Sequence, residues 1–500
     1  MGTTRRLSPE DREFFRDLAE AAATNPFSDV YTELQLKIAG CGRAATAGEL
    51  LRHIVERVSG KVRSLEAAGS ANVNLFGSDD HELLRRAFLF DVYHRFLREF
   101  ERLMGNQAAA GESSLPVPFA GEALSVLDRR GFAPAEALHC FAILYQVCRA
   151  FFFIDRALVG RSEPMKQLRR HLWNNVFTND IRMYERFLWN RMEDFSTMLF
   201  GETGTGKGAA AAAIGQSGFI PFDVKKGVFV QSFVSGFKVL NLSQFPESLI
   251  ESELFGHRKG AFTGAVEAHE GILARCSSHG AIFLDEVGDV SVPIQIKLLH
   301  VLQERNFSPV GSHEKMRFRG RIIAATNRPL ESLRSGGQFR DDFFYRLCSD
   351  VITVPSLRQR ISEEPGEIDD LVELIVRRIT GEDSPEITER VRRAIEVSPG
   401  RGYTWPGNVR ELEQAVRHIL VTGDYGGDVA AVQPDLCKRL QAGIADGVLD
   451  AAELMSGYCT LLYRRYGTYE EVARRTNLDR RTVKAYIRSR QAGRESELTT

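Results

Sequence analysis

The spacing of apolar residues changes along the chain and predicts three successive kinds of structure. Over residues 1–160 apolar positions recur at helical intervals, so an all-helical domain is expected there. Ser8-Pro9 is a typical helix start, because serine caps the first turn and proline fits inside it. The predicted helices cover residues 9–23, 46–68, 79–104 and 134–159, and the Gly/Ala/Ser/Pro-rich segment 105–118 is predicted to be a loop.

Short, mostly apolar segments replace the helical spacing in the middle of the chain. They stand at 195–200, 239–242, 280–284 and 321–325, and the one at 280–284 is an uninterrupted run. An uninterrupted run is typical of a strand buried on both faces of a sheet. Helices are predicted at 161–176, before the first segment, and at 209–214, directly after it. Strands that alternate with helices predict an α/β domain with a parallel sheet.

Helical spacing returns after residue 360. An acidic connection at 361–367 precedes predicted helices at 368–379, 386–397 and 410–420. A segment without periodicity, 426–449, is expected to be a linker. The last predicted helices cover 450–466, 469–476 and 479–490. The tight turn Asn477-Leu478 between the final two is typical of a helix-turn-helix.

Composition limits what the whole chain can bind. The chain has 500 residues, which suggests about three domains. Its net charge of −1 gives no overall attraction to nucleic acid, so any DNA binding has to be local. Residues 461–494 hold ten basic side chains against three acidic ones, a local phosphate-binding pattern. The predicted DNA-contacting residues are Arg480, Arg481, Thr482, Lys484 and Arg488. The alternative is a solvated basic helix pair that binds nothing.

The cysteines and the apolar segments favour a cytoplasmic protein without a membrane anchor. Seven cysteines are scattered, and none forms a CxxC pair, which suits reduced thiols better than disulfides or zinc. The N-terminal residues lack the apolar core of a signal peptide. The most apolar segment, 138–154, contains Gln146 and Arg149 and is expected to be too short to span a bilayer.

A glycine-rich phosphate loop follows the first predicted strand. Strand, glycine-rich loop and helix is the arrangement in which backbone N–H groups and a helix N-terminus hold phosphate groups. Lys207 can reach the β- and γ-phosphates of a nucleotide. Gly208 stands where many phosphate loops have the hydroxyl that touches Mg²⁺. The predicted nucleotide-binding residues are Gly201, Glu202, Thr203, Gly204, Thr205, Gly206, Lys207 and Gly208.

Polar residues end two of the predicted strands. Asp285 and Glu286 follow the run at 280–284, where ligands bind in open α/β sheets. Asp285 is expected to position Mg²⁺, through water, and Glu286 to polarise the attacking water. Thr326 and Asn327 end the next strand, where they can sense the γ-phosphate or orient water.

The stretch Glu251–Ala265, ESELFGHRKGAFTGA, lies between the phosphate loop and the acidic pair that begins at Asp285. Its glycines permit a sharp bend, and an aromatic presented there needs a partner to cover it. The alternative for GAFTGA alone is a tight turn around a buried phenylalanine. The stretch resembles the loop with which sigma-54-dependent transcriptional activators (bacterial enhancer-binding proteins) grip sigma-54. The residues that the resemblance assigns to this contact are Gly260, Ala261, Phe262, Thr263, Gly264 and Ala265.

The resemblance covers residues 160–425 strongly, 455–490 moderately and 1–155 not at all. It implies an AAA+ P-loop core with a parallel sheet and a helical lid, flanked by an all-α N-terminal domain and a Fis-type helix-turn-helix domain. The expected domains are 1–160, 161–360, 361–425 and 450–500, with 426–449 as a linker. Compared with the family pattern, 180–194 and 215–240 are insertions, and the sequence does not tell what they do.

Further roles come only from the resemblance. It implies that Asn241 pairs with the catalytic glutamate and that Asn327 is the first sensor. It also implies that Arg340 or Arg346 completes a neighbour's site in a ring of six or seven subunits, and that Arg410 contacts nucleotide from the lid. The alternatives are a turn residue at Asn241, intramolecular salt bridges from the two arginines to Asp341 or Asp342, and a turn and helix alone around Arg410.

The function implied is an ATPase that uses ATP and Mg²⁺. It would bind double-stranded DNA upstream of promoters and remodel the sigma-54 RNA polymerase holoenzyme to activate transcription. One alternative is a DNA-binding regulator with the same fold that acts without sigma-54. Another is an AAA+ remodeller of a different protein. The signal that reaches residues 1–160 is not readable from the sequence; a helical oligomerisation or docking domain without a ligand is the alternative there.

Overall fold

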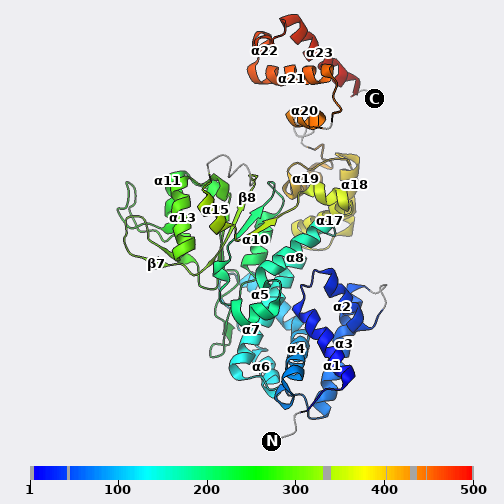
Figure 1. Cartoon of the computed structure of the whole chain (residues 1–500), viewed down its shortest axis with the longest axis vertical. Helices are drawn as coiled ribbons and strands as arrows, with labels where there is room; N and C mark the ends of the chain where they lie inside the picture. The colour runs from blue at the N-terminus through cyan, green and yellow to red at the C-terminus, as the bar shows by residue number, and fades with distance from the viewer. Residues whose placement is uncertain are drawn as a thin grey trace. The chain divides into compact units, whose positions relative to one another are not determined.

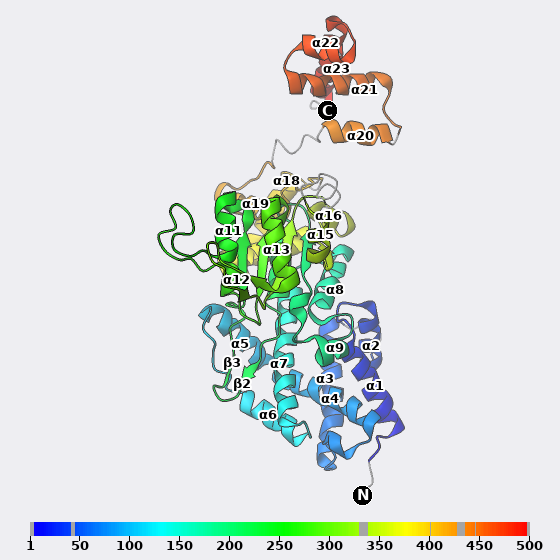
Figure 2. The ribbon, with the colours of Figure 1, turned by 60° about the vertical axis from the view of Figure 1, so that its left-hand side comes forward.

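The computed structural model describes residues 5–41, 46–329, 339–400, 402–427, 436–445 and 447–497. The chain forms two compact units. The first contains Met1–Thr388 and Gly407–Gln414, and the second contains Glu389–Pro406 and Ala415–Thr500. Figures 1 and 2 show the elements of both, and each unit is described by itself.

Seven α-helices make up the N-terminal part of the first unit. They are α1 (Pro9–Ala23), α2 (Asp29–Ala39), α3 (Ala47–Ala67), α4 (Ser78–Arg95), α5 (Leu97–Ala110), α6 (Ala120–Arg129) and α7 (Pro134–Phe151), with the 3₁₀ turn η1 (Val73–Leu75) before α4. The predicted cap at Ser8 is confirmed, because Ser8 accepts a hydrogen bond from the N–H of Asp11. Thr46 also forms a capping box with Glu49 at the start of α3.

Three details of this region differ from the prediction. The short helices α2 and α6 were not predicted. The single helix expected over 79–104 is divided at Phe96, whose ψ of 13° leaves the helical range. The loop expected from residue 105 begins only at Gly111, because α5 continues to Ala110. The buried Gln107 side chain stabilises this longer helix end by bonding the carbonyls of Gly111 and Ser113.

The helix α7 continues as a π-helical turn, η2 (Phe152–Arg156). Together, Pro134–Arg156 is 23 residues long and, by length and composition alone, could cross a membrane. The helix extends beyond the predicted apolar segment 138–154 at both ends, so the prediction that it is too short to span a bilayer was wrong for the helix as a whole. The helix is nevertheless mostly buried in protein, where it packs against α4, α5 and α6. Its polar residues Gln146 and Arg149 are 1% and 0% exposed.

A five-stranded parallel sheet confirms the predicted α/β class. Its strand order is β4 (Phe237–Asn241), β5 (Ala281–Asp285), β8 (Arg321–Thr326), β1 (Thr197–Phe200) and β9 (Asp350–Thr353). The register places Asn241 opposite Asp285 and Phe200 opposite Thr326. The predicted polar strand ends therefore meet at one edge of the sheet.

Successive strand residues point to two different cores. Leu199, Phe283 and Ile323 join one core with α8 (Glu163–Phe177), α10 (Lys207–Gly215) and the N-terminal helices. Met198, Leu284 and Ile322 join the other core. That second core also contains α11 (Glu247–Phe255), α12 (Ile272–Arg275), α13 (Val292–Glu304) and α15 (Asp341–Leu347). The N-terminal helices thus share a continuous hydrophobic core with one face of the sheet.

Short elements fill the segments between these. The two stretches regarded as insertions contain α9 (Ile181–Met183), η3 (Tyr184–Leu188), η4 (Met192–Asp194) and the hairpin of β2 (Phe222–Asp223) with β3 (Val228–Phe229). The turn η5 (Leu242–Gln244) follows β4, η6 (Val287–Asp289) follows β5, and β6 (Asn306–Phe307) pairs with β7 (Met316–Arg317).

Helices follow the sheet, as predicted. They are α16 (Leu357–Glu363), α17 (Glu367–Thr380), α18 (Pro385–Val397) and α19 (Asn408–Thr422). The predicted connection at 361–367 is shorter than expected, because α16 extends to Glu363. The helix α20 (Leu436–Ala445) lies in the segment predicted to be irregular, and Leu436 and Leu440 are buried where α20 packs against α21.

Three helices end the second unit: α21 (Ala451–Tyr466), α22 (Tyr469–Thr476) and α23 (Arg480–Glu497). Cys459, Val472, Val483 and Ile487 form their common core. Asn477 adopts the left-handed conformation, with φ +55°, at the turn between α22 and α23. The helix-turn-helix geometry predicted from the spacing is therefore present.

Candidate nucleotide and partner-binding sites

The phosphate loop is built by two glycines in the left-handed region. Gly204 has φ +81° and Gly206 has φ +104°, conformations that side chains resist. A Cβ at Gly204 would also collide with the carbonyl oxygen of Gly407. The helix α10 starts at Lys207 directly after this turn, so its N-terminal N–H groups face the loop. The loop therefore has the shape of an anion cradle.

Lys207 is nearly buried, with 6% of its surface exposed. Its Nζ donates to the carbonyl oxygens of Gly201 at 2.9 Å and Glu202 at 3.1 Å. Burial lowers the pKa of Lys207, and the carboxylates of Glu286 and Asp285 oppose that shift. A buried cation held mainly by neutral carbonyls is electrostatically suited to receive phosphate oxygens.

Asp285 ends β5, and Glu286 follows it with a φ of +56°. This backbone conformation is strained for a residue other than glycine, and such strain concentrates at functional sites. Burial raises the pKa of Glu286, the Lys207 charge lowers it and Asp285 raises it further, with a net increase. A carboxylate with a raised pKa is a stronger base than an ordinary surface glutamate.

The neighbouring strand ends place Asn327 between the acidic residues and the phosphate loop. Its backbone N–H lies 3.4 Å from Oε2 of Glu286, and its Nδ2 donates to Oγ1 of Thr203 at 2.9 Å. Thr326 is buried and accepts a hydrogen bond from the N–H of Arg328. These contacts join the end of β8 to the loop that would hold phosphate.

Asn241 lies opposite Asp285 in the register of β4 and β5. Its Oδ1 accepts hydrogen bonds from the N–H and the hydroxyl of Ser243, at 3.0 and 2.8 Å. This geometry is that of the strand-end turn residue. Among the described residues Asn241 makes no hydrogen bond to Glu286, and the pairing implied by the resemblance stays a prediction.

The motif that contains Arg410 contacts the phosphate loop mainly through Asn408. The Asn408 side chain is buried, with its Nδ2 3.2 Å from Oε2 of Glu202 and 3.1 Å from the carbonyl oxygen of Thr203. Its Oδ1 accepts from the N–H of Leu357 at 2.8 Å. The backbone N–H of Arg410 reaches the carbonyl oxygen of Gly204 at 3.3 Å.

Sequence reasoning named Arg410 and missed Asn408. The signal that could have found Asn408 is its place after Pro406-Gly407. Asn408 has φ +55°, a conformation that asparagine tolerates better than most residues. Glu202 also pairs with Arg358, which neutralises this acidic residue of the phosphate loop.

A cavity of about 310 Å³ lies beside these residues. Its lining includes the phosphate loop, Asp285, Glu286 and Arg410. It also includes the apolar residues Leu158, Met165, Leu168, Leu371 and Leu374. A cavity with both polar and apolar lining suits a nucleotide, which has charged phosphates and a flat, largely apolar base.

A buried ion pair, which the sequence did not reveal, holds the apolar wall in place. Arg360 donates to Glu367 at 2.6 Å, and both side chains are almost fully buried. Burial would raise the pKa of Glu367, but Arg360 and hydrogen bonds from Ser162 outweigh it and lower the pKa. Arg360 also donates to the carbonyl oxygen of Val159, so the pair fixes the segment that enters α8.

The two arginines after Phe339 form intramolecular contacts in this single chain. The exposed Arg340 pairs with Asp342 at 2.7 Å, which is the alternative considered from the sequence. Arg346 donates instead to the carbonyl oxygen of Leu302 at 3.0 and 3.1 Å. A role in a neighbouring subunit remains a prediction for both.

The GAFTGA segment forms a closed turn after α11. Gly260 has φ +81° and Gly264 has φ +100°, and the N–H of Gly260 bonds the carbonyl oxygen of Ala265 at 2.8 Å. Phe262 is 39% exposed, and its ring meets the ring of His257 with centroids 4.9 Å apart. Thr263 is exposed. Figure 2 shows the loops beside α11 reaching away from the sheet.

The predicted DNA-contacting residues divide into two groups on α23. Arg481, Lys484 and Arg488 are exposed, and their spacing places them on one helix face. Arg480 pairs with Glu470 at 2.9 Å, and the Thr482 hydroxyl donates to Asp479 at 2.6 Å. The first three therefore form the basic face of this helix.

Comparisons with known proteins found similarity over part of the chain. A family model described as the Sigma-54 interaction domain matches residues 177–353. Regulatory protein AtoC of Escherichia coli (strain K12) is 34% identical over 304 residues, 57% of this chain and 61% of that protein. The Nif-specific regulatory protein of Azotobacter vinelandii is 38% identical over 275 residues, 53% and 48% of the two chains.

A third relative is named for its dependence on sigma-54. This protein, the Sigma54-dependent transcriptional activator SfnR of Pseudomonas putida, is 39% identical over 231 residues, 45% of this chain and 57% of that protein. The chain thus spans about half to three fifths of the length of these relatives. Among solved structures, NtrX from Brucella abortus in complex with ADP matches 74% of this chain and 80% of that chain, with 21% identity and a TM-score of 0.40.

The matched segment contains the parallel sheet, the phosphate loop and the exposed loop after α11. This agreement confirms the AAA+ core that the resemblance implied. Residues 177–353 of this chain are therefore similar to the Sigma-54 interaction domain.

Proposed function

We propose that the chain is an ATP-hydrolysing transcriptional regulator of the cytoplasm. It binds DNA upstream of promoters and remodels the sigma-54 RNA polymerase holoenzyme to activate transcription. One observation carries this proposal. The phosphate loop and the strained Glu286 lie at the carboxyl ends of the strands, next to the end of β4, from which the chain leads to the GAFTGA loop. The match to the sigma-54 interaction domain supports the choice of partner.

The residues present fit a nucleotide. A Cβ at Gly204 would collide with the carbonyl oxygen of Gly407, and the lining of the adjacent cavity includes apolar residues that suit a base. Lys207 exchanges its two carbonyl partners for β- and γ-phosphate oxygens. Asn408 and Asn327 hold Glu202 and Thr203 of the loop in shape.

The acidic pair fits Mg²⁺ and water. Gly208 offers no hydroxyl, so Asp285 is the side chain that would hold the ion, through water. When bound, Mg²⁺ neutralises charge on the phosphates. Glu286 accepts a proton from the attacking water, and its raised pKa suits that role.

The path from this site to the loop is short. Asn241 lies opposite Asp285, and the chain then runs through η5 and α11 to Gly256. A displacement at the strand edge would therefore tilt α11, and the turn that presents Phe262 would move with it. This arrangement supports the loop as the element that transmits hydrolysis to sigma-54.

Two further parts of the proposal involve partners. Arg340 is exposed at the start of α15, so it can leave Asp342 for a phosphate in a neighbouring subunit of a ring of six or seven. Arg481, Lys484 and Arg488 form the face that would enter the major groove of DNA.

The proposal is tested with the purified chain, sigma-54 polymerase and a promoter that needs sigma-54. ATP-dependent promoter opening supports it. ATP hydrolysis without opening of any sigma-54 promoter would favour a regulator that acts without sigma-54. Absence of specific DNA binding would favour a remodeller of another protein.

A further inference from the structure

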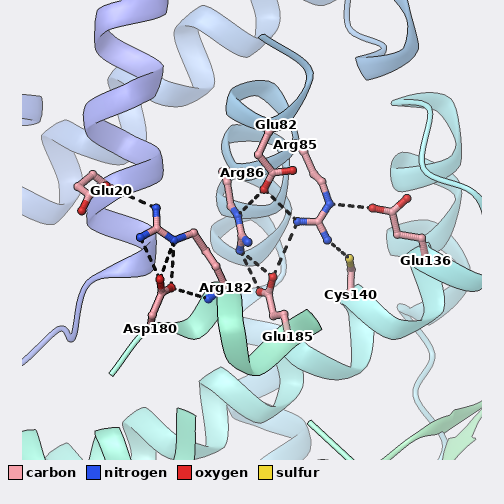
Figure 3. Close-up of polar contacts among 9 residues, drawn as sticks. All are labelled: Glu20, Glu82, Arg85, Arg86, Glu136, Cys140, Asp180, Arg182 and Glu185. Carbon is pink, nitrogen blue, oxygen red and sulfur yellow. Dashed lines mark hydrogen bonds and ion pairs between the residues drawn. The ribbon is translucent and has the colours of Figure 1, made fainter. Parts of the chain in front are cut away.

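The two inserted segments lie between the N-terminal helices and the sheet. In the first, Glu185 accepts hydrogen bonds and ion pairs from Arg86 at 2.9 Å, with Arg85 3.8 Å away. Figure 3 shows Glu185 reaching toward both arginines of α4 from the short helical segment that also carries Arg182. Arg182 in turn pairs with Asp180 and approaches Glu20 of α1 at 3.6 Å.

The second insertion contacts other elements of the N-terminal region, namely α7 and the segment between α5 and α6. The N–H of Val117 donates to the carbonyl oxygen of Gly227 in the β2–β3 hairpin. Phe229 of β3 stacks on Tyr145 of α7 with centroids 4.0 Å apart. Lys238 pairs with Glu112 at 2.7 Å. Both insertions therefore act as docking elements for the N-terminal helices.

The centre of this interface is the C-terminal end of α10. Arg149 of α7 donates to the carbonyl oxygens of Gln216 and Gly218, each at 2.6 Å. Gln146, one turn earlier, donates to the carbonyl oxygen of Ser217 at 2.9 Å. These three carbonyls directly follow α10, where the helix dipole favours a positive charge.

Burial of the charged Arg149 side chain at this position is energetically unfavourable. Its side chain is fully buried, and within the described residues its hydrogen bonds go to carbonyl oxygens and to no carboxylate. Its guanidinium also lies 4.7 Å from the ring centroid of Tyr145. Burying an unpaired charge costs several kcal/mol unless its surroundings compensate. A forked donor that spans two carbonyls has the geometry to fix the end of a helix rather than merely to fill space.

The helix α10 links this contact to the phosphate loop. It has nine residues, so Lys207 at its start lies about 13 Å from its end. So short a helix is expected to move as a rigid rod. The same α7 continues through η2 to Ala157, Leu158 and Val159, which line the candidate nucleotide cavity. The N-terminal helices thus contact the C-terminal end of α10 and lead directly into the lining of the cavity.

We propose that Arg149 is a positioning residue for nucleotide binding. It anchors the C-terminal end of α10 to the docked N-terminal helices, and thereby sets the position of Lys207 and the shape of the phosphate loop. Nucleotide affinity consequently depends on the docking of the N-terminal helices. This inference rests on the proposed function only in naming ATP as the nucleotide.

The test compares two buried arginines in the full chain. Arg149→Met removes the anchor. Arg130→Met removes another buried guanidinium of the N-terminal helices, one that pairs with Asp91 at 2.6 Å and makes no described contact with α10. Amide hydrogen exchange over 201–215 is measured without nucleotide, and the Kd for Mg-ATP is measured below the melting temperature of both variants.

Arg149→Met is expected to speed exchange in the phosphate loop and to weaken ATP binding at least about fivefold. Arg130→Met should lower the melting temperature yet leave both readouts at the parent values. Arg149→Lys should fall between, because it keeps the charge but cannot span two carbonyls. Parent-like exchange and affinity in Arg149→Met, or equal changes in both methionine variants, would overturn the inference.

The inference can still be tested if the Arg149→Met variant does not fold. If Arg149→Met does not fold, Gln146→Leu removes the neighbouring bond to Ser217, and the same two outcomes apply to it. A parent chain that binds no ATP would contradict the proposed function, whereas the exchange comparison would still decide the role of Arg149.

Discussion

The substitution Glu286→Gln separates nucleotide binding from hydrolysis. Glutamine has the same shape, and its amide oxygen can still accept from the N–H of Asn327, which lies 3.4 Å from Glu286 in the parent. Glutamine has the same backbone and Cβ as glutamate, so it adds no strain to the left-handed conformation at this position. What is lost is the ability to take a proton from water, which typically contributes about a hundredfold or more to the rate. A hundredfold loss corresponds to about 2.7 kcal/mol of transition-state stabilisation.

The pKa of Glu286 adds a second readout. Burial raises that pKa, so the carboxylate protonates at a higher pH than an ordinary glutamate does. Only the deprotonated form can act as a base. Hydrolysis by the parent should therefore fall as pH drops through the raised pKa, and the residual activity of Glu286→Gln should lack this step.

The assay is phosphate release at saturating ATP across a pH series, with the Kd for ATP measured in parallel. Asp289→Asn is the matched control, because Asp289 is a nearby carboxylate whose described ion pair is with Arg328. It should hydrolyse ATP at close to the parent rate. Near-parent turnover in Glu286→Gln, or an unchanged pH profile, would refute Glu286 as the base.

Three further predictions concern Arg340, Arg481 and Asn408. An Arg340→Ala chain and a Lys207→Ala chain should each be inactive and regain ATPase activity when mixed; no recovery despite demonstrated subunit exchange would contradict action in a neighbour's site. Arg481→Ala should weaken specific DNA binding by about 1–3 kcal/mol if it contacts a base, as titration with specific and random duplexes would show; unchanged binding to both would place it outside the interface. Asn408→Ala should lower the free energy of unfolding by about 1–3 kcal/mol, because the buried N–H of Leu357 loses its acceptor, and should weaken ATP binding; a parent-like denaturation midpoint would contradict that account.

The geometry of the candidate nucleotide site was largely predictable because its determinants are local. The glycines at 204 and 206, the strand before them and the helix after them are adjacent in sequence, and the acidic pair directly ends a buried strand. The break at Phe96 was not predictable from periodicity, since apolar positions continue through it at helical spacing. Asn408 escaped because its importance comes from the left-handed turn and from partners about 205 residues away.

The insertions show the limit of sequence reasoning most clearly. Arg86 and Glu185 are 99 residues apart, and Arg149 lies 67 residues from Gln216. No periodicity links such positions, so the docking of the N-terminal helices became visible only with the fold. The apolar character of α7 was equally ambiguous, because a buried core helix and a membrane span have the same composition.

The central claim is that the GAFTGA loop couples ATP hydrolysis to the opening of a sigma-54 promoter, and Phe262→Ala tests it most directly. Phe187→Ala is the control, because Phe187 is another exposed phenylalanine, 56% exposed, far from this loop in sequence. In a purified system with sigma-54 polymerase, Phe262→Ala should hydrolyse ATP and assemble like the parent. It should fail to bind sigma-54 in the presence of a γ-phosphate transition-state mimic and should not open the promoter, whereas Phe187→Ala should do both. Promoter opening by Phe262→Ala at the parent rate would contradict the claim and would favour a DNA-binding regulator that acts without sigma-54.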